Sequence, residues 1–114
     1  MNSKEWSVVI THQAHADIAR IFTYIADELQ AIDNAIHQTD RIYDHAAKLN
    51  RAPHGFGLLK MEPWRSDGVR LLPVDNFIIY FVPIDDRQIV YVWRVLYKGM
   101  DTQRHLGRFI LDIE

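Results

Sequence analysis

Two apolar segments separated by a short polar turn constrain the fold of this chain more than any other feature. Residues 77–82 and 89–96 are nearly unbroken runs of aliphatic and aromatic side chains. Side chains of these types favour strands, and Asp85-Asp86-Arg87 between the runs supplies a polar reversal. The pattern predicts a β-hairpin at the centre of a sheet.

Two amphipathic helices are predicted before this hairpin. Apolar residues recur at intervals of three and four over 14–29 and again over 32–49, which is the helical period. Thr11 is placed to N-cap the first helix, and Asp17 is assigned to one of its polar faces. Because the break near residues 30–33 is short, we expect an antiparallel helical hairpin. The expected buried stripe consists of Ala14, Ile18, Ile21, Phe22, Ile25 and Leu29, followed by Ile32, Ala35, Ile36, Thr39, Ile42, Tyr43, Ala46 and Leu49.

Shorter elements complete the chain. A strand is expected over 6–10, a long surface loop over 54–68 and a further strand over 69–72. Pro73 ends that strand or marks a sheet edge, because proline cannot donate to a ladder. Asp101 is a plausible N-cap of a last helix whose apolar residues are Leu106, Phe109 and Ile110. The order βααβββα indicates an α+β fold, and the length of 114 residues favours one domain, 1–114.

Composition excludes several classes of protein. A hydrophobic share of 48% and a charged share of 25% are typical of a soluble globular domain rather than a disordered chain. The sequence contains no cysteine, which excludes disulfide frameworks and thiolate metal sites. The N-terminal apolar run is too short for a signal peptide or a membrane span, so we expect a cytoplasmic protein without a membrane partner.

Charge is distributed unevenly along the chain. Residues 1–40 carry two basic and six acidic groups, whereas residues 41–108 carry eleven basic and seven acidic groups. The basic surplus of the second segment is well short of that expected when phosphate neutralisation alone drives nucleic-acid binding. Among the six histidines, no pair shares a metal-ligand spacing with a carboxylate, and we expect neither a metal nor a cofactor.

The last predicted strand is apolar on both faces. Alternation places Val90, Val92, Arg94 and Leu96 on one face, opposite Ile89, Tyr91, Trp93 and Val95. The helical hairpin can cover only one of these faces. We expect part of the other, the set Val90, Val92, Arg94 and Leu96, to bind a partner protein. The alternative is that the long loop and Trp64 fold over it.

Several local motifs occur in an order that is known from one family. They are Ile10-Thr11, Ala14, Asp17-Ile18, Tyr24-Ile25, Pro53-His54-Gly55, Val69-Arg70, Leu72-Pro73, the strand that begins at Asn76, and Arg94-Val95-Leu96-Tyr97 with Lys98, Gly99 and Asp101. In this order the chain resembles the toxins of type II toxin–antitoxin systems in the RelE/ParE superfamily, also called plasmid stabilisation proteins. The resemblance implies a small, mainly antiparallel sheet with a helical hairpin on one face. It also implies a cognate antitoxin as partner.

The resemblance leaves two activities open. Some members of the superfamily cleave messenger RNA on the ribosome, and others, of the ParE type, inhibit DNA gyrase by binding. The ribonuclease members carry cations on their sheet strands, to which Arg70, Arg94 and Lys98 would correspond here. Tyr97 occupies a place where histidine or tyrosine is seen in the family and could stack on a base or act as a weak acid, and His105 is a further candidate. At two further positions where a cation is common in those members, this chain has Leu72 and Ile78. We therefore expect a gyrase inhibitor rather than a ribonuclease.

Two alternatives remain. The chain could be a metal-independent ribonuclease that acts on ribosome-bound message, or a degenerate toxin fold that only binds its partner. For the ribonuclease candidates the structural alternative is that Tyr97 packs on the last helix and Lys98 is a solvated turn residue. Arg94 lies within an apolar strand and needs a partner such as Asp101, or an exit to solvent where it meets antitoxin or target.

Overall fold

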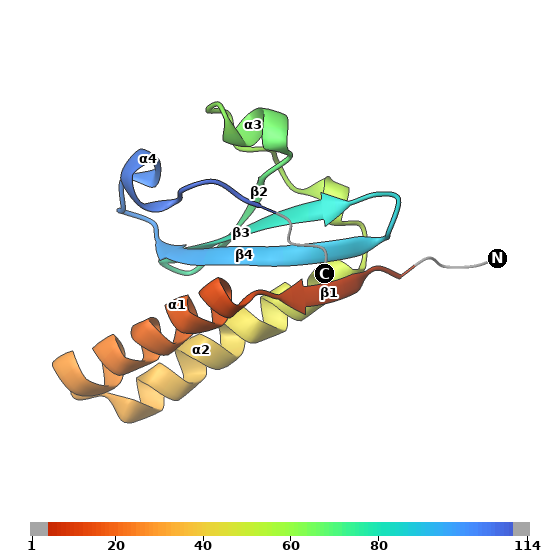
Figure 1. Cartoon of the computed structure of the whole chain (residues 1–114). Helices are drawn as coiled ribbons and strands as arrows, with labels where there is room; N and C mark the ends of the chain where they lie inside the picture. Colours follow the sequence, from red (N-terminus) through yellow and green to blue (C-terminus); the bar gives the residue numbers. More distant parts are fainter. Residues whose placement is uncertain (1–4, 111–114) are drawn as a thin grey trace.

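The computed structural model describes residues 5–110 and contains the expected elements in the expected order (Figure 1). They are β1 Ser7–Ile10, α1 His12–Thr23, the π-helical turn η1 Tyr24–Glu28, α2 Ile32–Ala47, the 3-10 turns η2 Lys48–Asn50 and η3 Pro53–Gly55, α3 Trp64–Asp67, β2 Arg70–Val74, β3 Phe77–Ile84, β4 Ile89–Tyr97 and α4 Thr102–His105. The loop predicted over 54–68 contains the short helix α3. The order βααβββα is otherwise confirmed.

The strands form one sheet in the order β1-β4-β3-β2. The hairpin of β3 and β4 lies at its centre, as predicted, and both pairings of β3 are antiparallel. β1 joins the sheet parallel to β4, with Ile10 opposite Val92 at the end of the pairing. Pro73 lies in the outer strand β2, where a missing backbone donor is tolerated.

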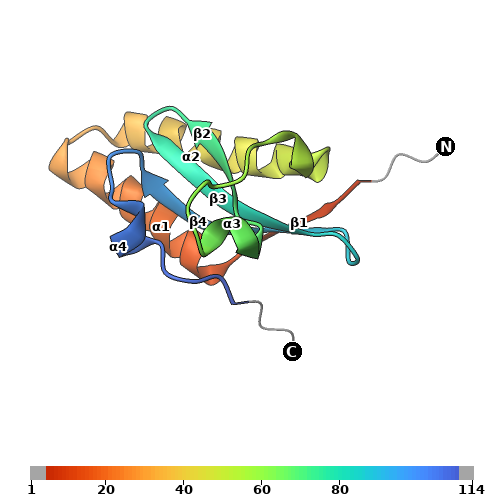
Figure 2. The same cartoon turned by 90° about the horizontal axis from the view of Figure 1, so that it is seen from above.

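The helical hairpin of α1 and α2 covers one face of the sheet (Figure 2). Thr11 caps α1 as expected, because its hydroxyl accepts a hydrogen bond from the amide of Ala14 at 3.1 Å. Ala14, Ile18, Ile42 and Ala46 from the helices pack against strand residues that include Phe81. This contact forms the larger of two apolar cores and orients α1 along β4.

The second face of the sheet is covered by the chain itself. Trp64 of α3 is 5% exposed and Leu106 is 1% exposed, and both pack against Tyr80, Trp93 and Leu96. The indole Nε1–H of Trp64 donates to the carbonyl of Gly107 at 2.5 Å, which holds the C-terminal segment on α3. The expectation that this face awaits a partner is therefore wrong. The long loop and Trp64 cover it.

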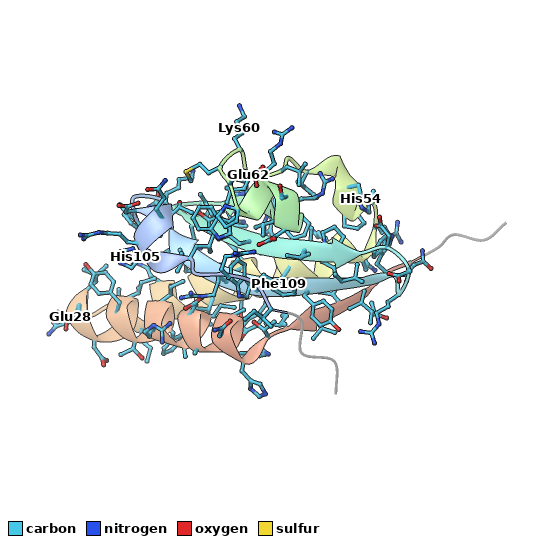
Figure 3. All side chains as sticks on the ribbon, turned by 45° about the horizontal axis from the view of Figure 1, so that its top comes forward. Glu28, His54, Lys60, Glu62, His105 and Phe109 are labelled. Carbon is cyan, nitrogen blue, oxygen red and sulfur yellow. The ribbon has the colours of Figure 1, made fainter. Side chains whose placement is uncertain are left out.

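The closing helix is shorter than expected. It ends at His105, so Leu106, Phe109 and Ile110 lie beyond it in a segment that crosses the sheet. Figure 3 shows Phe109 beside the strands, where its ring packs 5.6 Å from that of Trp93, measured between ring centroids. Among residues 5–110, no helix is long and apolar enough to cross a membrane.

Three residues of the expected helical stripe are exposed. Leu29, Ile32 and Ile36 are 56%, 60% and 43% exposed. The π-helical turn η1 changes the angular step of the helix before Leu29, and the hairpin extends beyond the sheet at this end (Figure 1). The helical period therefore predicted the stripe correctly only where the sheet lies beneath it.

Candidate functional site

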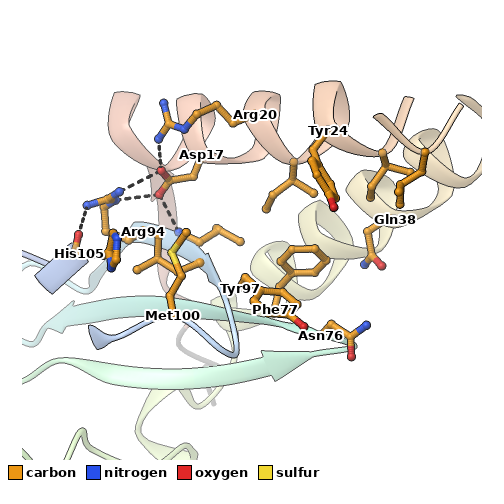
Figure 4. A pocket seen from close by; sticks show the side chains of 15 residues that line it. Asp17, Arg20, Tyr24, Gln38, Asn76, Phe77, Arg94, Tyr97, Met100 and His105 are labelled. Carbon is orange, nitrogen blue, oxygen red and sulfur yellow. Dashed lines mark hydrogen bonds and ion pairs between the residues drawn. The ribbon is translucent and has the colours of Figure 1, made fainter. Parts of the chain in front are cut away.

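A groove of about 800 Å³ lies between the helical hairpin and the end of the sheet where β3 begins and β4 ends (Figure 4). It exists because β1 pairs with β4 only as far as Val92, so the rest of that edge of β4 faces α1 instead of a strand. Its lining is mostly apolar and comes from α1, η1, α2, both central strands and α4. The lining residues are Asp17, Arg20, Ile21, Tyr24, Ile25, Leu29, Gln38, Asn76, Phe77, Arg94, Val95, Leu96, Tyr97, Met100 and His105.

A buried ion pair closes one end of the groove. Asp17 is 3% exposed, and its carboxylate accepts from Nε and Nη2 of Arg94 at 2.7 and 3.0 Å. The same carboxylate accepts from the amide of Val95 at 2.9 Å and from Arg20. Bidentate, charge-assisted bonds of this kind are stronger than neutral ones and offset the cost of burying both charges. Asp17 thus joins α1 to the open edge of β4.

Arg94 also reaches the C-terminal end of α4. Its Nη1 donates to the carbonyl of His105 at 3.0 Å, so one guanidinium links α1, β4 and α4 (Figure 4). Arg94 has a carboxylate partner, as one of the two alternatives required, but the partner is Asp17 and not Asp101. The carboxylate of Asp101 instead caps α4 by accepting from the amide of Gln103. The cation within the apolar strand is satisfied internally.

Aromatic side chains form the opposite wall of the groove. Tyr97, at the end of β4, is 54% exposed, and its ring lies edge-on to that of Phe77 with centroids 6.0 Å apart. Tyr24, 58% exposed, faces the groove from η1. Met100 also lines the groove, nearer to Arg94 and His105 (Figure 4). The arrangement offers apolar and aromatic contact area to a ligand or a peptide segment.

The structure brings together only some of the ribonuclease candidates. Arg94, Tyr97 and His105 line the groove, and Lys98 lies in the exposed turn beside it. Arg70 pairs with Phe81, whereas Tyr97 pairs with Phe77. Four residues of strand, about 13 Å, therefore separate the two positions along the sheet.

Arg70 is engaged at its own end of the sheet. Its Nη1 donates to the carbonyl of Phe56 at 2.5 Å and to that of His54 at 3.5 Å. These bonds hold the loop after α2 against β2. The five candidates therefore do not form one cluster.

The expected partner-binding set is not one surface. Val92 lies opposite Phe81 and Arg94 opposite Tyr80, so Trp93 is an extra residue, a β-bulge that interrupts the alternation. Val90 and Val92 are completely buried under the helices, and Leu96 is buried on the other face. The prediction that Val90, Val92, Arg94 and Leu96 share an exposed face is wrong.

Asp17 is the groove residue that the sequence interpretation placed incorrectly. It is not on a polar face of α1 but points at the sheet. Asp17 lies three residues after Ala14 and four before Ile21, which places it on the apolar stripe of α1. This spacing is the feature of the sequence that indicated its burial. A carboxylate on a buried helical stripe and a lone cation in an apolar strand each need a partner, and here they are partners.

Within the described residues, 5–110, no three histidine, aspartate or glutamate side chains lie close enough together to hold a metal ion. The groove's polar groups are instead the paired Asp17 and Arg94, the exposed Arg20, the amides of Gln38 and Asn76, His105, and the hydroxyls of Tyr24 and Tyr97. Its chemistry is that of a recognition surface with an apolar floor and a few hydrogen-bonding groups.

Known proteins resemble the chain at the level of family and fold. A family model described as ParE toxin of type II toxin-antitoxin system, parDE, matches residues 8–102. A structure of the chromosomal ParDE system from P. aeruginosa matches with a TM-score of 0.68 and 20% identity, covering 83% of this chain and 98% of that one. No curated protein matches the chain significantly.

Two further solved structures share the fold. The RelBE2 toxin–antitoxin complex from Mycobacterium tuberculosis matches with a TM-score of 0.59 and 17% identity, over 82% of this chain and 98% of that one. A mutant of the E. coli toxin RelE in the free state matches with a TM-score of 0.57 and 9% identity, over 83% and 85%. The predicted α+β fold, with its mainly antiparallel sheet, is confirmed.

Proposed function

The chain belongs to the ParE toxin family of type II toxin–antitoxin systems, and from this premise we propose that it inhibits DNA gyrase by binding. We further propose that a cognate antitoxin neutralises it by occupying the groove. Both proposals go beyond family membership. They are supported by the hydrogen bonds and the ion pair that the arginines of the sheet make within the protein.

The proposal rests on one observation: both strand arginines are bonded to other parts of the protein. Cleaving RNA without a metal requires cations that can approach the developing charge on the phosphate. Arg94 is only 17% exposed and is held by Asp17, and Arg70 donates to loop carbonyls away from Tyr97. Both arginines serve the fold. Inhibition by binding, unlike RNA cleavage, does not require these arginines to leave their partners within the protein and contact a phosphate.

The groove has the properties of a site for an amphipathic segment of an antitoxin. Tyr24, Phe77, Tyr97 and Met100 supply apolar area. Arg20 lines the groove, and the exposed Lys98, Asp101 and Arg104 lie next to groove residues in the chain. The surplus of cations at this rim favours a segment with acidic groups on its outer side. The ParDE and RelBE2 structures named above are likewise toxin–antitoxin systems.

Two assays on the purified chain test this proposal. One measures plasmid supercoiling by purified bacterial gyrase, and the other measures cleavage of message bound to ribosomes. We expect supercoiling to be blocked and message to remain intact. Cut message with normal supercoiling would refute gyrase inhibition. If expression without a partner does not slow growth at all, a toxin fold that only binds its partner becomes the better assignment.

One observation favours the ribonuclease as a second candidate. Tyr97 and His105 line the same groove, so a base could stack on Tyr97 near a group that exchanges protons. Tyr97→Phe separates the two candidates because it keeps the ring and removes the hydroxyl. A gyrase inhibitor should retain its toxicity in this variant, whereas a ribonuclease that uses the hydroxyl should lose it.

A further inference from the structure

The end of the helical hairpin is a second exposed apolar surface. We call it the hairpin tip and define it as residues 24–36, from Tyr24 of η1 to Ile36 of α2. Its side chains Leu29, Ile32 and Ile36 have exposed fractions of 56%, 60% and 43%. Three large aliphatic side chains in thirteen residues are more than the scattered single exposures of an ordinary surface.

The backbone of the hairpin tip presents these side chains outward. The amide of Leu29 bonds to the carbonyl of Tyr24 at 3.3 Å, the i to i+5 bond of a π-helix, and Gln30 has a φ of +50°. π-Helical turns are rare and are frequently found at functional sites. A regular α-helical turn would continue the stripe that buries Ile25. The π-turn instead ends it.

The hairpin tip is strongly acidic. Between Arg20 and Arg41 the chain contains no lysine or arginine, and Asp27, Glu28 and Asp33 are all exposed. No salt bridge involves these three carboxylates within the part of the chain that the structure describes. Figure 3 shows Glu28 at the end of the hairpin, away from the loop around Lys60 and Glu62.

The charges at the hairpin tip and beside the groove have opposite signs. Arg20, Lys98 and Arg104 outnumber the exposed Asp101 at the groove, whereas all the charged side chains of the tip are carboxylates. A partner with acidic groups suits the groove and is repelled by the tip. Like charges also disfavour packing of the tip against a second copy of itself. The surface that complements the tip is apolar and basic.

We propose that the hairpin tip is a docking surface for the toxin's target. The tip adjoins the groove that takes the antitoxin, because Tyr24, Ile25 and Leu29 belong to both, whereas Ile32 and Ile36 do not line the groove. The occupant is an apolar depression on the target protein with lysine or arginine at its rim. This inference rests on the proposed function, which makes gyrase that target. It assigns recognition of the target to Ile32 and Ile36, with Leu29 at the border with the groove, and orientation of the target to the carboxylates.

Two variants of the hairpin tip test this inference. Asp27→Lys/Glu28→Lys reverses its charge at the C-terminal end of the first helix, where cations suit the helix dipole, so folding should not suffer. Ile32→Ser/Ile36→Ser removes exposed apolar area. The matched control Asp44→Lys/Asp86→Lys changes net charge equally at exposed sites outside the tip. Each protein is titrated in the gyrase supercoiling assay, with circular dichroism and thermal unfolding as checks of the fold.

We expect each tip variant to need at least tenfold more protein than the control for half-inhibition, with an unchanged circular dichroism spectrum. Raising the salt concentration should weaken inhibition by the parent chain more than inhibition by the charge-reversed variant. Folded tip variants that inhibit as well as the control would overturn the inference and leave gyrase inhibition standing. A parent chain that fails to inhibit gyrase overturns both.

Discussion

The ring of Tyr97 lies directly against the backbone of Gly99. A Cβ built on Gly99 would be 2.7 Å from Cε2 and 3.2 Å from Cδ2 of that ring. Carbon atoms in contact are separated by about 3.5–4.0 Å. The absence of a side chain at residue 99 therefore lets Tyr97 occupy its place at the wall of the groove.

Gly99→Ala should displace the ring of Tyr97 without unfolding the protein. The ring is more than half exposed and can rotate away, so we expect a change in stability within about 1 kcal/mol. Because Tyr97 lines the groove, affinity for a groove partner should fall. The control is Gly57→Ala, where a Cβ meets nothing within 4 Å. Shifts of the Tyr97 ring resonances in the first variant and not in the second would confirm the contact.

Asp17→Asn should be among the most destabilising single changes of a polar residue. It removes the charge that neutralises Arg94 while keeping an oxygen for the amide of Val95, and breaking a buried ion pair costs about 3–5 kcal/mol. Urea unfolding measures this loss. Asp17→Asn/Arg94→Met should recover part of it, since no unpaired buried charge remains.

Arg20→Ala is the matched comparison for that experiment. Arg20 binds the same carboxylate, but its side chain is 68% exposed, and exposed ion pairs contribute about 0–1 kcal/mol. A loss from Arg20→Ala equal to that from Asp17→Asn would mean that Arg94 is not the main partner of Asp17.

Acid should weaken the link between α2 and the β2–β3 turn. Hydrogen bonds from Arg41 and then from Gln38 hold the pKa of Asp75 below its usual range. A lowered folded pKa stabilises the protein above the pKa of the unfolded chain, and this contribution is lost as pH falls through the folded value. The free energy of unfolding should therefore decline below about pH 4.

Asp75→Asn should remove this part of the acid dependence. Asn tolerates the φ of +55° found at this residue, so the turn itself should persist. Unfolding curves measured between about pH 2 and pH 7 provide the comparison. Asp86→Asn, in the other hairpin turn, is the control. A parent-like acid profile in Asp75→Asn would contradict the assignment.

Trp64→Phe should loosen the C-terminal segment. Phenylalanine keeps most of the apolar contact but loses the hydrogen bond to the carbonyl of Gly107, so we expect a loss of about 1–3 kcal/mol. Amide exchange at residues 106–109 should accelerate. Asp67→Ala, which removes the exposed bidentate pair with Arg108, should cost less than about 1 kcal/mol. Equal losses would show that the segment is held by its charges and not by the indole.

Local patterns predicted the elements well. Interactions between residues close in sequence determine the apolar strands β3 and β4 and the cap at Thr11. The edge position of Pro73 follows from its missing backbone donor. The family resemblance added the arrangement of the sheet. What local patterns missed involves distant residues, as with Leu29 and Ile32, whose exposure depends on how far the sheet extends beneath the hairpin.

The spacing of hydrophobic residues was sufficient to predict the helices, the strands and their order, because this spacing follows the repeat of the helical or extended backbone. Only the packed fold decided that Trp93 is a bulge, that Asp17 meets Arg94 across 77 residues, and that Trp64 covers the second face. Each of these depends on which distant side chains compete for one buried space. A buried charge requires a partner of opposite charge, and an apolar face of the sheet must be covered by other residues. The tertiary structure determines which residues lie close enough to do so.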